Sequence, residues 1–122
     1  MQNQIQNDMK TANNIGTQFL QAFYKNGVDI SNFYGQDSIL TFESDTFIGK
    51  DEIVGKLNQF QVNTVPNNYS IQPSENGILI YCSGHLVIMG QTNKIPFMRC
   101  IFLVCKNGSY YVKNDIYKIT FG

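Results

Sequence analysis

Residues 96–120 read PFMRCIFLVCKNGSYYVKNDIYKIT, and this stretch decides the fold class. Two runs rich in apolar, β-branched and aromatic residues flank Asn107 and Gly108, which both tolerate the positive φ angles of a tight hairpin turn. A two-residue loop at this point places Lys106 opposite Ser109. The stretch therefore predicts two antiparallel strands, at residues 96–105 and 110–120.

Further strands are expected before this hairpin. Turn signals at 73–77 and 90–94 bound a long strand at 78–89, and shorter strands are expected at 38–42, 46–48 and 69–72. The 78–89 strand is apolar on both faces, since Leu79, Tyr81 and Val87 alternate with Ile80, Leu86 and Ile88. A sheet with one solvated face would alternate apolar and polar residues. We therefore expect a second layer on each face, and a homodimer through the sheet supplies one of them.

Two helices are expected on the N-terminal side of most strands. Apolar residues recur at three- and four-residue steps from Ile5 to Phe23, and Gly27 follows as a C-terminal stop. The polar first turns predict fraying over residues 1–8. Asp29 or Ser31 is expected to cap a short helical turn through residues 33–34, and a second helix follows Gly49. These patterns indicate a single α+β domain over residues 1–122, with the helices on one face of an antiparallel sheet.

Composition excludes several classes of function. Nine basic and nine acidic residues give a net charge of zero, and Arg99 is the only arginine, so a nucleic-acid partner is not expected. The longest apolar runs are far shorter than the ~20 residues of a membrane span. Three cysteines without a C-x-x-C pair indicate free thiols in a reducing compartment. Neither a glycine-rich phosphate loop nor a zinc motif is present, so no cofactor or metal is expected.

Catalytic signals in the sequence are weak. His85 is the only histidine, and Asp115 is the acid that we nominate as its partner in acid–base chemistry. A lone histidine on a strand, without a nucleophile motif, is more often structural. Glu43 and Asp45 flank a turn and are interpreted as solvated carboxylates. The residues by themselves therefore predict no enzyme.

Several segments resemble a known family in the same order. They are residues 15–19 (IGTQF), 23–24 (FY), 40–43 (LTFE), 47–50 (FIGK), 53–57 (IVGKL), 76–77 (NG), 84–86 (GHL), 101–103 (IFL) and 110–118 (YYVKNDIYK). Over residues 15–119 the chain resembles the nuclear transport factor 2 (NTF2)-like family. That resemblance implies a cone-shaped fold in which a bent antiparallel sheet carries its helices on the concave side, with an open cavity and dimerisation through the sheet.

The resemblance also implies a function, that of a non-enzymatic carrier. Such a carrier binds GDP-bound Ran and FxFG nucleoporins, imports Ran into the nucleus, and is found in the cytoplasm, the nucleus and the nuclear pore. On this basis the Ran-binding residues are Phe42, Glu43, Val62, Gln91 and Asn93, and the nucleoporin-binding residues are Ala12, Ile116 and Tyr117. An aromatic wall beside a carboxylate suits recognition, because it combines apolar burial with an orienting charge.

Two departures from the family pattern keep alternatives open. Residues 90–94 read GQTNK where the family carries acids, and Ala12 stands where the family carries tryptophan. The first alternative is an interaction module of the same fold, either a partner in a messenger-RNA export heterodimer or a binder of Phe-rich peptides. The second is a small-molecule isomerase or dehydratase that uses His85 and Asp115.

Overall fold

The computed structural model describes residues 2–25, 27–60, 62–88 and 93–119 of the 122. Its elements are helix α1 (Gln2–Phe23), the 3-10 turn η1 (Ile30–Phe33), strands β1 (Tyr34–Phe42) and β2 (Asp45–Ile48), helix α2 (Lys50–Phe60), and strands β3 (Val62–Ser74), β4 (Gly77–Ile88), β5 (Lys94–Lys106) and β6 (Ser109–Ile119). The helix-first order confirms the α+β class. Asp29 caps η1 as expected, accepting a hydrogen bond from the backbone of Ser31, whereas Tyr34 already begins β1.

The strands form one six-stranded sheet in the order β2-β1-β6-β5-β4-β3. Our expectation of a wholly antiparallel sheet closed by its last strand was wrong, because β1 and β6 run parallel and β6 lies inside the sheet. Turn residues predict pairing only between strands that follow each other in the chain. The β1–β6 pair joins segments that are far apart in the sequence, so no local sequence pattern predicts it.

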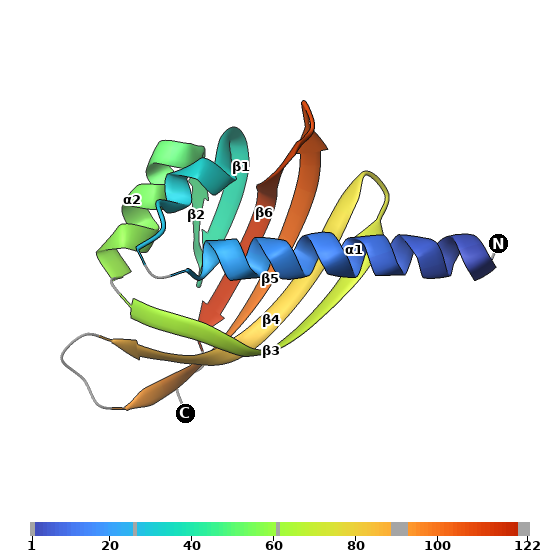
Figure 1. Ribbon diagram of the computed structural model, residues 1–122. Helices are drawn as coiled ribbons and strands as arrows, with labels where there is room; N and C mark the ends of the chain where they lie inside the picture. Colours follow the sequence, from blue (N-terminus) through green and yellow to red (C-terminus); the bar gives the residue numbers. More distant parts are fainter. Residues whose placement is uncertain (1, 26, 61, 89–92, 120–122) are drawn as a thin grey trace.

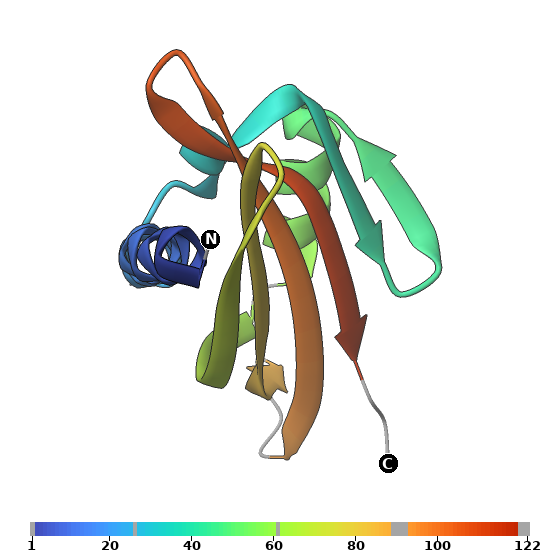
Figure 2. The same ribbon diagram turned by 90° about the vertical axis from the view of Figure 1, so that its right-hand side faces the viewer.

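The hairpin between β5 and β6 confirms the sequence analysis. Asn107 and Gly108 have φ angles of 55° and 82°, and Lys106 lies opposite Ser109. Beyond the turn the pairing shifts between Phe102 and Leu103, and similar shifts occur in the β1–β6 and β3–β4 pairs. Such bulges bend strands, which accounts for the curvature of the sheet in Figures 1 and 2.

Both helices pack on one face of the sheet, which we call the inner face. Helix α1 lies across β3 and β4, and α2 lies against β1 and β2 (Figure 1). Ala12, Phe19 and Phe23 of α1 are buried against this face, and α1 continues back to Gln2 beyond the edge of the sheet. Fraying of its first turns stays a prediction. The opposite, outer face of the sheet is covered by neither helix.

Candidate functional site

The Phe42–Glu43 pair lies where β1 ends beside β6. Phe42 is paired with Tyr117, and the next residue, Glu43, turns toward β2 with a φ angle of +58°. A left-handed backbone is costly for a non-glycine residue, so surrounding contacts must hold it. Glu43 has such contacts with β6: its N–H donates to Tyr117 O (2.9 Å), its carbonyl accepts from Lys118 Nζ, and its Oε1 accepts from the Ile119 N–H.

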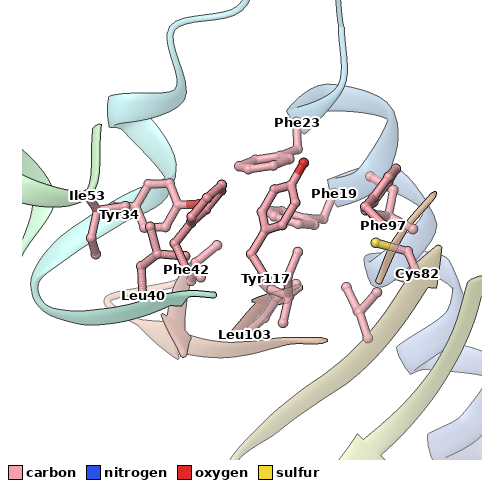
Figure 3. Close-up of a cluster of buried hydrophobic side chains, with 14 of the residues drawn as sticks. Phe19, Phe23, Tyr34, Leu40, Phe42, Ile53, Cys82, Phe97, Leu103 and Tyr117 are labelled. Atoms are coloured by element: carbon pink, nitrogen blue, oxygen red, sulfur yellow. The ribbon is translucent and has the colours of Figure 1, made fainter. Parts of the chain in front are cut away.

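The Phe42 ring lies inside the molecule and is only 4% exposed. Its centroid is 5.0 Å from that of Tyr117, and the two side chains lie next to each other in Figure 3. The Lys56 ammonium of α2 lies 5.0 Å from the Phe42 centroid and 5.8 Å from that of Phe47. Both distances suit a cation–π contact. Phe42 therefore contacts a neighbouring strand and a cation from α2.

A buried ion pair between Arg99 and Asp115 lies next to the Tyr117 ring. Arg99 Nε donates to Asp115 Oδ1 (2.9 Å) and Arg99 Nη2 donates to Asp115 Oδ2 (2.7 Å), so the pair is bidentate. Tyr34 donates to Asp115 (2.7 Å), and Arg99 donates to the hydroxyls of Tyr34 (3.0 Å) and Tyr24 (3.3 Å). These contacts connect β5 and β6 to β1 and to Tyr24, the residue that follows α1. Hydrogen bonds of this kind are what a buried charge pair requires.

Sequence reasoning missed this network, although a signal was present. Arg99 alternates with Phe97 and Ile101 on β5, so its strand position already places it on the apolar inner face. Burial raises the pKa of the Tyr34 hydroxyl well above its usual value, and the neighbouring Asp115 raises it further. For Arg99, burial lowers the pKa, but Asp115 and the two tyrosines outweigh it and raise the pKa above its ordinary value. The guanidinium therefore carries its positive charge beside Asp115.

Of the other residues that the resemblance placed at the Ran site, Asn93 lies further along the sheet. Asn93 is exposed and lies just before β5, six residues before Arg99. Arg99 pairs with Tyr117, and Tyr117 pairs with Phe42, so these three residues lie at the same height across the sheet. At about 3.3 Å per residue, the six residues span roughly 20 Å along the strand. Val62 begins β3 opposite Ile88, but its side chain, like the whole of Gln91, lies outside the described residues.

The three residues that the resemblance placed at the nucleoporin site do not share one surface within a chain. Ala12 is buried on the side of α1 that faces the sheet, and Tyr117 is buried on the inner face of β6. Ile116 points the other way and is 48% exposed on the outer face. Consecutive residues of a strand face opposite sides of the sheet, so Ile116 and Tyr117 cannot both line one groove of the same chain.

The outer face carries a patch of exposed apolar side chains. Tyr81, Cys100 and Ile116 lie side by side on β4, β5 and β6, because each is paired in register with the next. The exposed members of this outer patch are Ile48, Leu79, Tyr81, Met98 and Ile116. The two-sided apolar pattern predicted for the 78–89 strand is confirmed, since Ile80 and Leu86 are buried on the inner face. Exposed apolar patches of this kind mark interaction surfaces.

Comparison with known proteins identifies the family. The model of the family described as "Nuclear transport factor 2 (NTF2) domain" matches residues 11–119. This chain belongs to the NTF2 family. Its relatives include nuclear transport factor 2 of Candida albicans, 35% identical over 89% of this chain and 95% of the relative, and that of Davidiella tassiana, 30% identical over 93% and 98%. The solved structure of nuclear transport factor 2 from Cryptosporidium parvum is 27% identical, with a TM-score of 0.72 over 96% of this chain and 95% of that one.

Family membership agrees with the six-stranded α+β fold, and the geometry of the sheet tests the pair of residues on which the enzyme alternative depends. His85 is exposed on the outer face, whereas Asp115 is buried on the inner face and bound to Arg99. The pairing of His85 with Asp115 was therefore wrong, because the sheet itself separates the two side chains. Among the described residues, no group of three or more His, Cys, Asp or Glu side chains could hold a metal ion. Neither described helix is long and apolar enough to cross a membrane.

Proposed function

We propose that this chain is a carrier that binds the GDP-bound form of the GTPase Ran at the Phe42–Glu43 end of β1 and imports it into the nucleus. The NTF2 family match over residues 11–119 and relatives named nuclear transport factor 2 support this function. The observation that supports this site most directly is the left-handed backbone conformation of Glu43, which hydrogen bonds to β6 hold in place next to the buried Phe42. Strained residues that are firmly held cluster at functional sites.

In this proposal Glu43 supplies the charge that orients the partner. A carboxylate has two oxygens, and Oε1 already accepts from the backbone of β6, which fixes the direction of the side chain. A basic group of Ran would then form a charge-assisted hydrogen bond to a preorganised acceptor. Gln91 and Asn93 are neutral, so Glu43 carries most of the electrostatic recognition, while Phe42 and Val62 provide apolar contacts.

The same proposal includes a homodimer formed through the outer patch. Neither α1 nor α2 packs on this face, and its exposed members Tyr81 and Ile116 lie on β4 and β6, on either side of Cys100 of β5. FxFG nucleoporins would bind at the edge of this dimer. Of the residues Ala12, Ile116 and Tyr117, the exposed Ile116 is the one that we propose as a direct contact.

The proposed carrier is not an enzyme, requires no cofactor and moves between cytoplasm and nucleus through the nuclear pore. The alternative, an interaction module of the same fold, is favoured by one observation: the segment 90–94 of the sequence contains a lysine and no acid. Such a module would bind Phe-rich peptides or a second, different chain in place of Ran.

Titration calorimetry against Ran loaded with GDP or with a GTP analogue tests the proposal. Glu43→Gln keeps an oxygen that accepts from Ile119 but removes the charge, so affinity for the GDP form should fall about tenfold or more while stability is unchanged. Glu43→Lys should abolish binding, and Lys10→Gln, a charge change on the exposed side of α1, is the control. Binding to neither nucleotide form would contradict the carrier and favour the interaction module.

A further inference from the structure

Phe42 lies in a column of stacked cations and aromatic rings that crosses the inner face from α2 to α1. The column consists of Lys56, Phe42, Tyr117, Arg99 and Phe23. The Arg99 guanidinium carbon lies 4.7 Å from the Tyr117 centroid and 4.9 Å from that of Phe23, and the Tyr117 and Phe42 centroids are 5.0 Å apart. Phe42 thus connects the buried part of the column to Lys56.

Tyr117 and Lys56, which both contact the Phe42 ring, differ in how easily they can move. Tyr117 packs against Arg99, and Arg99 is held by Asp115 and two tyrosine hydroxyls. Lys56 is half-buried and holds its ammonium over the rings through a flexible four-carbon chain. Releasing Lys56 costs its cation–π contacts with Phe42 and Phe47 and disturbs none of the buried hydrogen bonds of Arg99.

We propose that Lys56 is a displaceable lid over Phe42. The proposal rests on the proposed function, in which a partner contacts Phe42, a ring that is only 4% exposed in this structure. A partner that inserts an aromatic or other apolar side chain against this ring competes with the Lys56 ammonium for the same surface. Lys56 therefore lowers the affinity of the site and restricts it to side chains that stack on Phe42 better than an ammonium does.

Substitutions of Lys56 with opposite expected effects test the lid in binding. Lys56→Ala removes the cation, so affinity for GDP-loaded Ran should rise about two- to fivefold, which is what a partly exposed cation–π contact contributes. Lys56→Arg should lower the affinity, because a planar guanidinium stacks better on aromatic rings than an ammonium does. Lys50→Ala, on the first turn of the same helix, changes the net charge equally and should leave the affinity unchanged.

A second measurement needs no partner. The chain has no tryptophan, so Phe42→Trp introduces the only one at the ring itself, and its fluorescence can be excited apart from that of the seven tyrosines. Adding Lys56→Ala should raise the acrylamide quenching constant of this tryptophan at least about twofold, and Lys50→Ala should leave it unchanged. If Phe42→Trp lowers the midpoint temperature of unfolding, fluorine NMR of the chain labelled with 4-fluorophenylalanine replaces the quenching experiment. The Phe42 resonance is assigned from the signal that Phe42→Leu removes. This resonance should shift when Lys56→Ala is introduced.

The outcomes separate the lid from the proposed function. An equal or lower affinity of Lys56→Ala for GDP-loaded Ran overturns the lid and leaves the carrier intact. Unchanged quenching and an unchanged fluorine resonance also overturn it. Increased quenching together with no Ran binding by any variant supports Lys56 as the cover of Phe42 and contradicts the carrier.

Discussion

Arg99 donates two hydrogen bonds to Asp115 in a part of the molecule that water does not reach. Arg99→Met removes one charge and leaves the other buried and unpaired, so the free energy of unfolding should fall by about 3–5 kcal/mol. The double change Arg99→Met with Asp115→Leu removes both charges and should recover part of that loss. Urea unfolding followed by circular dichroism measures both, and a loss below about 1 kcal/mol for Arg99→Met would show that the pair is not desolvated.

Tyr34 predicts a stability change at alkaline pH. Burial and the neighbouring Asp115 raise its pKa in the folded state, whereas a tyrosine of the unfolded chain has a pKa of about 10. Above pH ~10 the unfolded state loses a proton that the folded state keeps, so the free energy of unfolding falls as the pH rises, and the contribution is fully present below pH ~10. Tyr34→Phe should therefore weaken this alkaline decline.

Urea unfolding of the parent chain and Tyr34→Phe at pH 8, 10 and 11 measures the difference. Tyr110→Phe, at an exposed tyrosine, is the matched control and should keep the parent slope. An identical decline in the parent chain and Tyr34→Phe would mean that the Tyr34 hydroxyl does not keep its proton in the folded state.

At the scale of the helices and strands, two glycines in different surroundings give opposite predictions for the stability of the protein. A Cβ at Gly77, which begins β4, would collide with the backbone oxygen of Leu103, whereas a Cβ at Gly55, inside α2, meets nothing within 4 Å. Gly77→Ala should lower the free energy of unfolding by about 1–3 kcal/mol. Gly55→Ala should raise it by about 0.5–1 kcal/mol, because alanine is the better helix former. Thermal unfolding of both variants measures whether each substitution lowers or raises stability. Equal effects of the two substitutions on stability would contradict the close approach of β4 to β5 at Gly77.

How far the sequence predicts these elements depends on how local their causes are. Apolar periodicity and the Asn107-Gly108 turn predict both helices and the β5–β6 hairpin, because each depends on neighbouring residues. The bulge between Phe102 and Leu103 is different. It shifts the register of β6 by one residue, so Asp115 faces inward and Ile116 outward, and a one-residue slip reverses every side chain. The Arg99–Asp115 contact therefore could not be predicted from the hairpin turn.

The same reasoning applies to the candidate site. The adjacency of Phe42 and Glu43 follows from the chain itself, and the family resemblance directed attention to it. The contacts of Glu43 with β6 and of Lys56 with Phe42 depend on the parallel β1–β6 pair and on the packing of α2, which the sequence did not predict. Local patterns thus predict which residues are present, and the long-range pairing decides what they contact.

At the scale of the whole molecule, the outer patch predicts a dimer that a single charge disrupts. Ile116→Lys places an ammonium in the centre of the patch, next to Cys100, and should weaken self-association at least about tenfold. Tyr69→Lys changes an exposed apolar residue of edge strand β3 that shares its face with the buried Cys82, so it leaves the patch intact and serves as the control. Sedimentation equilibrium measures both variants. A parent chain that stays monomeric at high concentration would remove the dimer from the proposal.

The proposal that Ran is recognised at the Phe42–Glu43 end of β1 is tested most directly by amide NMR of the labelled chain during titration with GDP-loaded Ran. We expect the largest shifts at Glu43 and Ile119, which are hydrogen-bonded to each other, and at Lys56, which lies over the Phe42 ring. The hairpin at Asn107, near the other end of β6, should not respond. Shifts confined to the hairpin or to the outer patch, with Glu43 unmoved, would contradict the proposed site.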